Sequence, residues 1–114
     1  MKADGITLSE RDRAIIRRVL APYGNRIERV GVFGSRALGT ATPASDIDLV
    51  LWGDVDDALA ARLWTLFDES SLAVTVDLVV HSPALAPTIK RHLDLVAKPL
   101  FSKTDLLVAK ADPI

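Results

Sequence analysis

Two aspartates stand two residues apart in the segment Ser45-Asp46-Ile47-Asp48-Leu49, which opens an apolar run. Side chains alternate between the two faces of a β-strand, so a strand here would direct Asp46 and Asp48 to the same side. Two neighbouring carboxylates repel each other unless water or a cation compensates their charge. Mg²⁺ is usually held by one or two carboxylates together with water and substrate phosphate oxygens. The pair therefore predicts a metal site that works with a phosphate compound.

A glycine-serine pair precedes these aspartates. Gly34-Ser35 follows the apolar run Ile27 to Phe33 and begins a segment that could form one turn of helix. The start of a helix offers unpaired backbone N–H groups and the positive end of the helix dipole, and glycine lets the backbone approach a phosphate closely. We predict Gly34 and Ser35 as nucleotide-binding residues. Arg36 has a planar guanidinium that suits phosphate, and it either joins them or lies on the surface.

A third carboxylate, Asp77, is the one charged residue in the β-branched run Leu72 to Val80. The apolar neighbours predict a central, well-covered strand, in which a lone carboxylate is costly without a cation or a hydrogen-bond donor. We therefore predict Asp77 as the third acidic residue of the site. The alternative is an ordinary hydrogen-bonded aspartate at the end of a strand.

Each part of this pattern also has a structural explanation, because an alternating strand often has a polar face and Gly-Ser is a common turn. The combination is more specific for a nucleotide site than either part alone. It consists of a strand, the Gly-Ser pair, one helical turn, Gly39, a polar loop, the Asp-x-Asp pair and a second strand. Ser45 is expected to cap the turn before Asp46. No spacing of His81 and His92 supports a zinc site, and both are interpreted as ordinary surface residues. The two tryptophans, Trp52 and Trp64, are interpreted as core or interface residues.

The remaining periodicity predicts the elements that position these residues. Helices are predicted from near Ser9 to Pro22, over Ser35–Leu38, after a cap at Asp54, and from Ser82-Pro83 onward; strands are predicted over Ile27–Phe33, Asp46–Trp52 and Leu72–Val80, with a short edge strand at Leu100-Phe101. This order indicates an α/β (α+β) chain with a small mixed twisted sheet flanked by helices. The arginines of the first helix are interpreted as a solvated face, with a surface for a partner as the alternative. Residues 106–108 either return to the core or contact a partner.

Composition limits the class of protein. The chain has 114 residues, which favours one domain over 1–114. Its 14 Lys and Arg against 15 Asp and Glu give a net charge of −1, which argues against direct nucleic acid binding. No apolar run approaches the ~20 residues of a membrane helix. The N-terminal residues have no apolar segment of a signal peptide, and the absence of cysteines is compatible with a reducing cytoplasm, so a soluble cytoplasmic protein is expected.

The motifs of Gly34-Ser35, Gly39 and Ser45 to Leu49 resemble the signature of the DNA polymerase β nucleotidyltransferase superfamily. The short chain, with Gly-Ser-Arg-Ala at 34–37, is similar to the minimal nucleotidyltransferases (MNT) in particular, over roughly residues 27–101. The resemblance implies a polymerase-β-like nucleotidyltransferase fold whose two central strands carry the acidic residues. It also implies ATP as substrate and two Mg²⁺ ions bound by Asp46, Asp48 and Asp77, with Asp77 deprotonating the attacking hydroxyl.

The same resemblance implies a partner and a function. Minimal nucleotidyltransferases are commonly the antitoxins of HEPN-domain toxins, and the activity implied is transfer of AMP from ATP to a toxin tyrosine in a type VII-like toxin–antitoxin pair. Two alternatives stay open. The chain could neutralise a toxin by binding alone, or it could modify a small molecule such as an aminoglycoside. The complete set of three carboxylates argues against the first alternative, and the shortness of the chain, which leaves little wall for an acceptor pocket, argues against the second.

Overall fold

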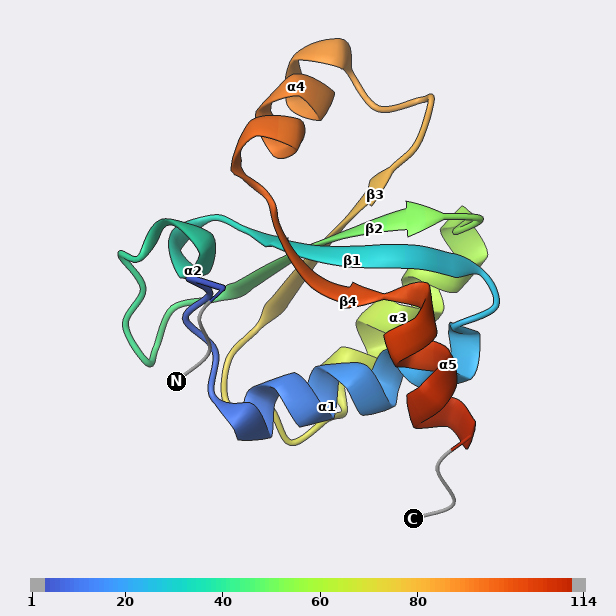
Figure 1. Cartoon of the computed structure of the whole chain (residues 1–114), viewed down its shortest axis with the longest axis horizontal. Helices are drawn as coiled ribbons and strands as arrows, with labels where there is room; N and C mark the ends of the chain where they lie inside the picture. The colour runs from blue at the N-terminus through green and yellow to red at the C-terminus, as the bar shows by residue number, and fades with distance from the viewer. Residues whose placement is uncertain (1–3, 112–114) are drawn as a thin grey trace.

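A computed structural model describes residues 4–111 as a four-stranded sheet with helices on both sides (Figure 1). The strands are β1 (Ile27–Phe33), β2 (Ile47–Gly53), β3 (Val76–His81) and β4 (Lys98–Ser102), and the helices are α1 (Glu10–Leu20), η1 (Ala21–Tyr23, a 3₁₀ turn), α2 (Ser35–Leu38), α3 (Asp57–Asp68), α4 (Pro87–Val96) and α5 (Lys103–Ala111). The strand order is β3-β2-β1-β4, and only the β2–β3 pair is parallel. The predicted mixed sheet flanked by helices is confirmed.

The hydrophobic core lies between the sheet and the helices α1, α3 and α5, which Figure 1 shows below the strands. Ile47, Leu49 and Leu51 alternate along β2 and are fully buried in this core. Burying an aliphatic side chain of this size contributes about 1.5–3 kcal/mol. Because neighbouring residues in a strand face opposite sides, the core fixes the direction of Asp48, which faces away from these helices.

The predicted helix caps at Ser9 and Gly39 and the predicted bounds of β1 and α2 are confirmed. The Ser9 hydroxyl caps α1 by accepting a hydrogen bond from the backbone N–H of Asp12 at 3.0 Å. The bounds of β1 and α2 agree with the prediction. Gly39 ends α2 in the left-handed conformation, with φ of 80°, as a glycine C-cap does.

Several boundaries differ from the prediction. β2 covers Ile47–Gly53 instead of Asp46–Trp52, so Asp46 lies just outside the strand, and β4 is longer than the predicted pair Leu100-Phe101. The loop before β3 extends to residue 75, so this strand is shorter than predicted. Asp56, and not Asp54, caps α3 by accepting a hydrogen bond from the Leu59 N–H at 2.8 Å. α4 begins at Pro87 rather than at Ser82-Pro83. A proline is well suited to the first helical position and holds the preceding residue extended, which explains the later start.

The prediction that Asp77 lies in a central strand is wrong. β4 pairs with the free side of β1, so β3 has a neighbouring strand only on the β2 side and forms one edge of the sheet. The expectation of two central acidic strands fails for the same reason: β2 is central and β3 is not. The inward-facing Val76 and Leu78 are buried although the strand is at an edge, which explains the apolar sequence pattern.

The C-terminal segment returns to the core. Residues 103–111 form α5, and Leu106 is fully buried while Leu107 and Val108 are exposed. The apolar periodicity of residues 106–108 is weak because only Leu106 packs into the core. Among the described residues, no helix is long and apolar enough to cross a membrane.

One arginine of α1 does not belong to a solvated face. Arg13 is buried; it donates hydrogen bonds to the carbonyls of Ile6 and Leu8 and forms an ion pair with Asp4 at 2.9 Å. Its hydrogen bond to Asp4 is the main reason that the pKa of this carboxyl is lowered. Arg13 thus fastens the N-terminal segment to α1, whereas the other arginines of the helix are exposed as predicted.

Candidate active site

The parallel register places Asp48 of β2 directly beside Asp77 of β3, and both side chains are half-buried. The pKa of Asp48 is raised, first by burial and then by the charge of Asp77 and a hydrogen bond with it; the charge of Asp46 adds to the same effect. Two carboxylates in such a position are stabilised by a proton or a cation between them. The two strands therefore build an acidic pair that suits a divalent cation.

The glycine-serine turn lies against this acidic pair. Phe33, at the end of β1, is the register partner of Asp48, and Gly34 follows it with φ of +68°. A Cβ atom on Gly34 would collide with the carboxylate of Asp48. Ser35 then begins α2. Two features that the sequence analysis predicted separately, Gly34 and Asp48, are thus in contact, and only glycine fits at this place.

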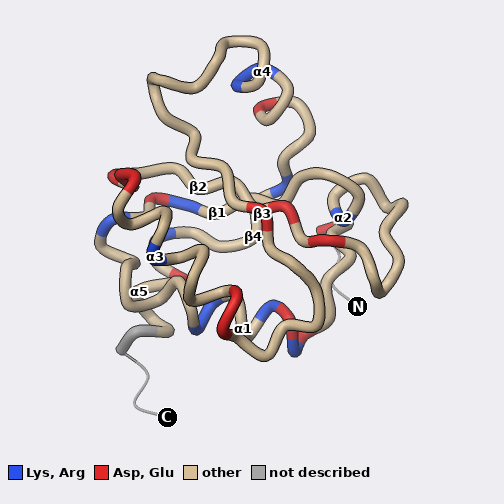
Figure 2. Tube along the Cα trace, turned by 180° about the vertical axis from the view of Figure 1, so that it is seen from behind, with Lys and Arg blue, Asp and Glu red and all other residues tan. Residues whose placement is uncertain are grey.

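Asp46 stands immediately before β2 and is exposed. Its charge acts on Asp48, so it lies in the same electrostatic environment. Among residues 4–111, no group of three or more His, Cys, Asp or Glu side chains is arranged to hold a metal ion by itself. The site is therefore an adjacent pair with Asp46 nearby. Figure 2 shows acidic residues along β2 and β3. Mg²⁺ fits such a set, because it takes water and phosphate oxygens as its remaining ligands.

Arg36 lies within the fold with 5% of its surface exposed. Its guanidinium donates hydrogen bonds to the carbonyl of Ser45 at 2.7 Å and to that of Thr7 at 3.1 Å. The surface alternative for this residue is therefore wrong. In this structure Arg36 ties the loop before Asp46 to the segment before α1. The Ser45 hydroxyl accepts a hydrogen bond from the Thr42 N–H at 2.9 Å, which confirms the predicted turn.

We expect Arg36→Lys to lower the free energy of unfolding by about 2 kcal/mol, because hydrogen bonds from charged groups are strong and a lysine cannot reach both carbonyls. Urea unfolding measures the change, with the exposed Arg91→Lys as control. An unchanged unfolding midpoint together with weaker ATP binding would instead favour the phosphate-binding role predicted for Arg36.

The raised pKa of Asp48 has a consequence for stability. The folded chain holds this proton more tightly than the unfolded chain, so the contribution of Asp48 to stability falls as pH rises from about 3.8 through the raised pKa. At neutral pH the ionised carboxylate therefore destabilises the fold. We expect Asp48→Asn to raise the melting temperature at pH 7 without Mg²⁺. Millimolar Mg²⁺ should raise the melting temperature of the wild type and have little effect on the variant. A lower melting temperature for Asp48→Asn would contradict this expectation.

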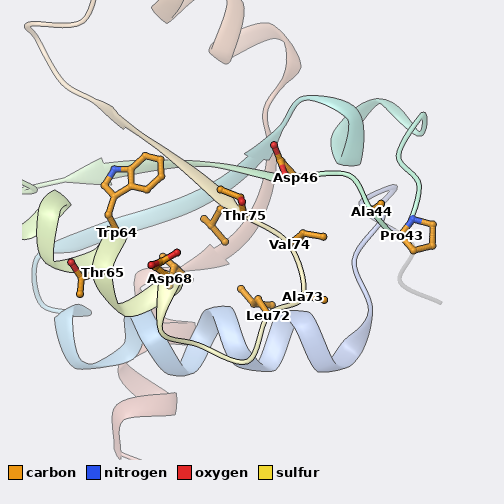
Figure 3. A pocket seen from close by; sticks show the side chains of 12 residues that line it. Pro43, Ala44, Asp46, Trp64, Thr65, Asp68, Leu72, Ala73, Val74 and Thr75 are labelled. Carbon is orange, nitrogen blue, oxygen red and sulfur yellow. The ribbon is translucent and has the colours of Figure 1, made fainter.

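A cleft of about 920 Å³ lies beside Asp46. Trp64 of α3 lies toward one end of it and Pro43 and Ala44 toward the other, with Asp46 and Thr75 between them (Figure 3). Leu72 and Val74, from the loop before β3, also line it. Of the three predicted acidic residues, Asp46 lines the cleft, and Asp48 and Asp77 do not. Sequence reasoning missed this cleft; in the structure, its large aromatic residue Trp64 is 40% exposed.

The face of the sheet that carries Asp48 continues into an aromatic stack. The Arg29 guanidinium lies 3.7 Å from the centre of the Trp52 ring, and His81 stacks on the same tryptophan at 5.3 Å between ring centroids. His81 Nε2 lies 3.2 Å from a carboxylate oxygen of Asp94 in α4. His81 is therefore not an ordinary surface residue: it joins the third strand to the helix above the sheet.

The fold thus sets a pair of carboxylates beside a glycine turn. Residues 13–104 match the nucleotidyltransferase domain family, and because this match spans most of the chain, the chain belongs to that family. No curated protein matches the chain.

Three solved structures illustrate the similarity of fold. A crystal structure of a toxin–antitoxin with AMP-PNP has 20% identity and a TM-score of 0.67, over 87% of this chain and 81% of that chain. A mutant of the toxin–antitoxin MntA-HpeT, with two aspartates changed to glutamate, has 17% identity and a TM-score of 0.63, over 86% and 80%. A second mutant of MntA-HpeT, with a tyrosine changed to alanine, has 21% identity and a TM-score of 0.65, over 91% and 81%.

Proposed function

We propose that the chain is a cytoplasmic antitoxin that transfers AMP from ATP to a tyrosine hydroxyl of a HEPN-domain toxin. The observation that carries the proposal is the adjacent pair of Asp48 and Asp77 in contact with the Gly34 turn. Membership of the nucleotidyltransferase family supports nucleotidyl transfer. The AMP-PNP complex supports an adenine nucleotide, and the toxin–antitoxin structures support a toxin as partner.

The residues have distinct roles in this reaction. Gly34 and Ser35 hold the triphosphate, and Asp46, Asp48 and Asp77 would hold Mg²⁺. When bound, Mg²⁺ neutralises charge on the phosphate oxygens and on the leaving group. Asp77 accepts the proton of the acceptor hydroxyl. The hydroxyl oxygen forms a bond to the α-phosphorus, the bond from this phosphorus to the oxygen that bridges to the β-phosphate breaks, and pyrophosphate leaves.

Labelled ATP tests the proposal directly. The purified chain is incubated with Mg²⁺, its co-purified partner and ATP labelled on either the α- or the γ-phosphate. The proposal predicts that the partner acquires label from α-labelled ATP and none from γ-labelled ATP. Label from the γ-position would show phosphoryl transfer instead. A partner that stays unlabelled but inactive would show an antitoxin that acts by binding, and label on an added aminoglycoside would show a small-molecule enzyme.

A further inference from the structure

Helix α4 crosses one face of the sheet. It connects β3 with β4, which are the two edge strands, so the chain between them passes over β2 and β1. Figure 1 shows α4 on the side of the sheet opposite to α1, α3 and α5. Asp48 faces away from those three helices, and Asp77 is its register partner in β3. Because the core fills the opposite face, substrates reach the acidic pair from the face that carries α4.

The C-terminal end of α4 lies near the phosphate-binding turn. The helix begins beyond the end of β3 that is farther from Asp77, and it ends two residues before Lys98. In β4, Lys98 is the register partner of Val32, which precedes Gly34 by two residues. Leu95, in the last turn of α4, is 79% exposed. The helix therefore descends toward the acidic site and carries an exposed apolar side chain at that end.

Helix α4 is attached to the sheet chiefly through two of its residues. Of its ten residues, Leu93 is the only one that is buried, and Val50 on the sheet face that α4 crosses is also fully buried; neither belongs to the main core. The second attachment is Asp94, whose carboxylate oxygen lies 3.2 Å from His81 Nε2. This Nε2 atom is buried and has no aligned hydrogen bond to any described residue, so Asp94 is the group that compensates its burial.

The imidazole of His81 is itself held by a row of side chains across the sheet. The strand register places Trp52 between Arg29 and His81. The Arg29 guanidinium lies over the indole, and the His81 ring stacks on it with an angle of 27° between the ring planes. Gly31 leaves room for the indole, since a Cβ atom there would lie 3.0 Å from it. The stack fixes the ring that presents Nε2 to α4.

We propose that His81 is a positioning residue for nucleotidyl transfer: through Asp94 it holds α4 beside the acidic site and so sets the access of the protein acceptor. The apolar surface exposed by Leu95 and Ile89 suits a protein acceptor better than a triphosphate. The triphosphate would be held at the Gly34 turn, which is built from β1 and α2. Loss of the contact therefore weakens acceptor binding and spares nucleotide binding. This proposal rests on the proposed function.

The test uses His81→Phe, Asp94→Ala and the double variant, with Asp57→Ala as the control. Phenylalanine keeps an aromatic ring on Trp52 but removes Nε2, and the Asp94 side chain is 58% exposed, so both variants are expected to fold. Asp57 is an exposed aspartate of α3, on the other side of the sheet. Three quantities are measured: the KM and the kcat of AMP transfer to the co-purified partner protein, and the Kd for AMP-PNP. Thermal melting establishes folding.

Each single variant is expected to raise the KM for the partner about fivefold or more, which is the usual lower range for coupling between a remote contact and a binding site. The kcat and the Kd for AMP-PNP should change by less than about twofold, since the chemistry and the triphosphate site are untouched. The double variant should raise the KM no further than the larger single effect, because the two side chains form one contact. The control should change none of these quantities.

Three results would overturn the assignment. A wild-type KM in the folded variants would show that the hold on α4 does not affect the acceptor. Multiplied effects in the double variant would show that His81 and Asp94 act independently. Weaker AMP-PNP binding with an unchanged KM for the partner would make α4 a wall of the nucleotide site. If His81→Phe unfolds, Asp94→Ala at the exposed end of the contact decides the matter through the KM. Absence of transfer by the wild type is a different result, which overturns the proposed function itself.

Discussion

The double substitution Asp46→Asn/Asp48→Asn is expected to lower the rate of AMP transfer by about 10⁴-fold or more, because removal of one preorganised electrostatic group typically costs ~10²–10³ in rate. Asparagine keeps the size of the side chain but removes the charge that would hold the metal. The rate is measured as incorporation of α-labelled AMP into the partner. The matched control is Asp54→Asn, since Asp54 is an aspartate with 89% of its side chain exposed.

The melting temperature and the binding of the partner distinguish a loss of catalysis from a loss of folding or of partner binding. The double variant should melt at a temperature no lower than the wild type, because the substitution removes negative charge beside Asp77. It should still form a complex with the partner. Transfer at the wild-type rate by this variant would show that the two aspartates are not part of the catalytic site.

The second large effect is expected for Gly34→Ala. An L-residue at φ of +68° loses roughly 1–2 kcal/mol, and the added Cβ also meets the Asp48 carboxylate. We expect the free energy of unfolding to fall by about 3 kcal/mol and AMP transfer to fall at least a hundredfold, because Asp48 must move. Urea unfolding and the labelling assay measure the two effects.

Gly39→Ala is the control for this substitution. Gly39 has φ of +80°, but no atom lies within 4 Å of the place that a Cβ would occupy. This variant should show only the backbone strain of roughly 1–2 kcal/mol and should keep most of the transfer activity. Equal losses of activity in the two variants would show that contact with Asp48 is not what Gly34 provides.

The features that could be predicted from the sequence depend on neighbours in the chain. β1, α2 and the left-handed Gly39 follow from an apolar run, a turn and a glycine that lie next to one another. The strand that holds Asp48 follows from its alternating apolar residues, although it begins at Ile47 and leaves Asp46 outside it. The pairing of Asp48 with Asp77 is a contact between strands, and the family resemblance, not the spacing, implied that these residues meet.

The features that were missed depend on contacts between distant parts of the chain. β3 is an edge strand because β4, formed near the C-terminus, pairs with β1. Arg36 and Arg13 are buried because backbone carbonyls accept their hydrogen bonds. Every residue has a backbone carbonyl, so the sequence does not indicate which of them will meet an arginine. The cleft results from the packing of α3 against the loop before β3. No periodicity in either segment indicates the space between them.

The central claim, that the acidic pair beside Gly34 directs AMP transfer to a protein partner, is tested most directly by intact mass. The partner is co-purified from the native host with the wild-type chain and with Asp46→Asn/Asp48→Asn, and its mass is measured in each case. The proposed function predicts a partner that carries AMP with the wild type and is unmodified with the variant. A partner that is unmodified in both cases, yet bound and inactive, would contradict the transferase function and show that this chain neutralises its partner by contact alone.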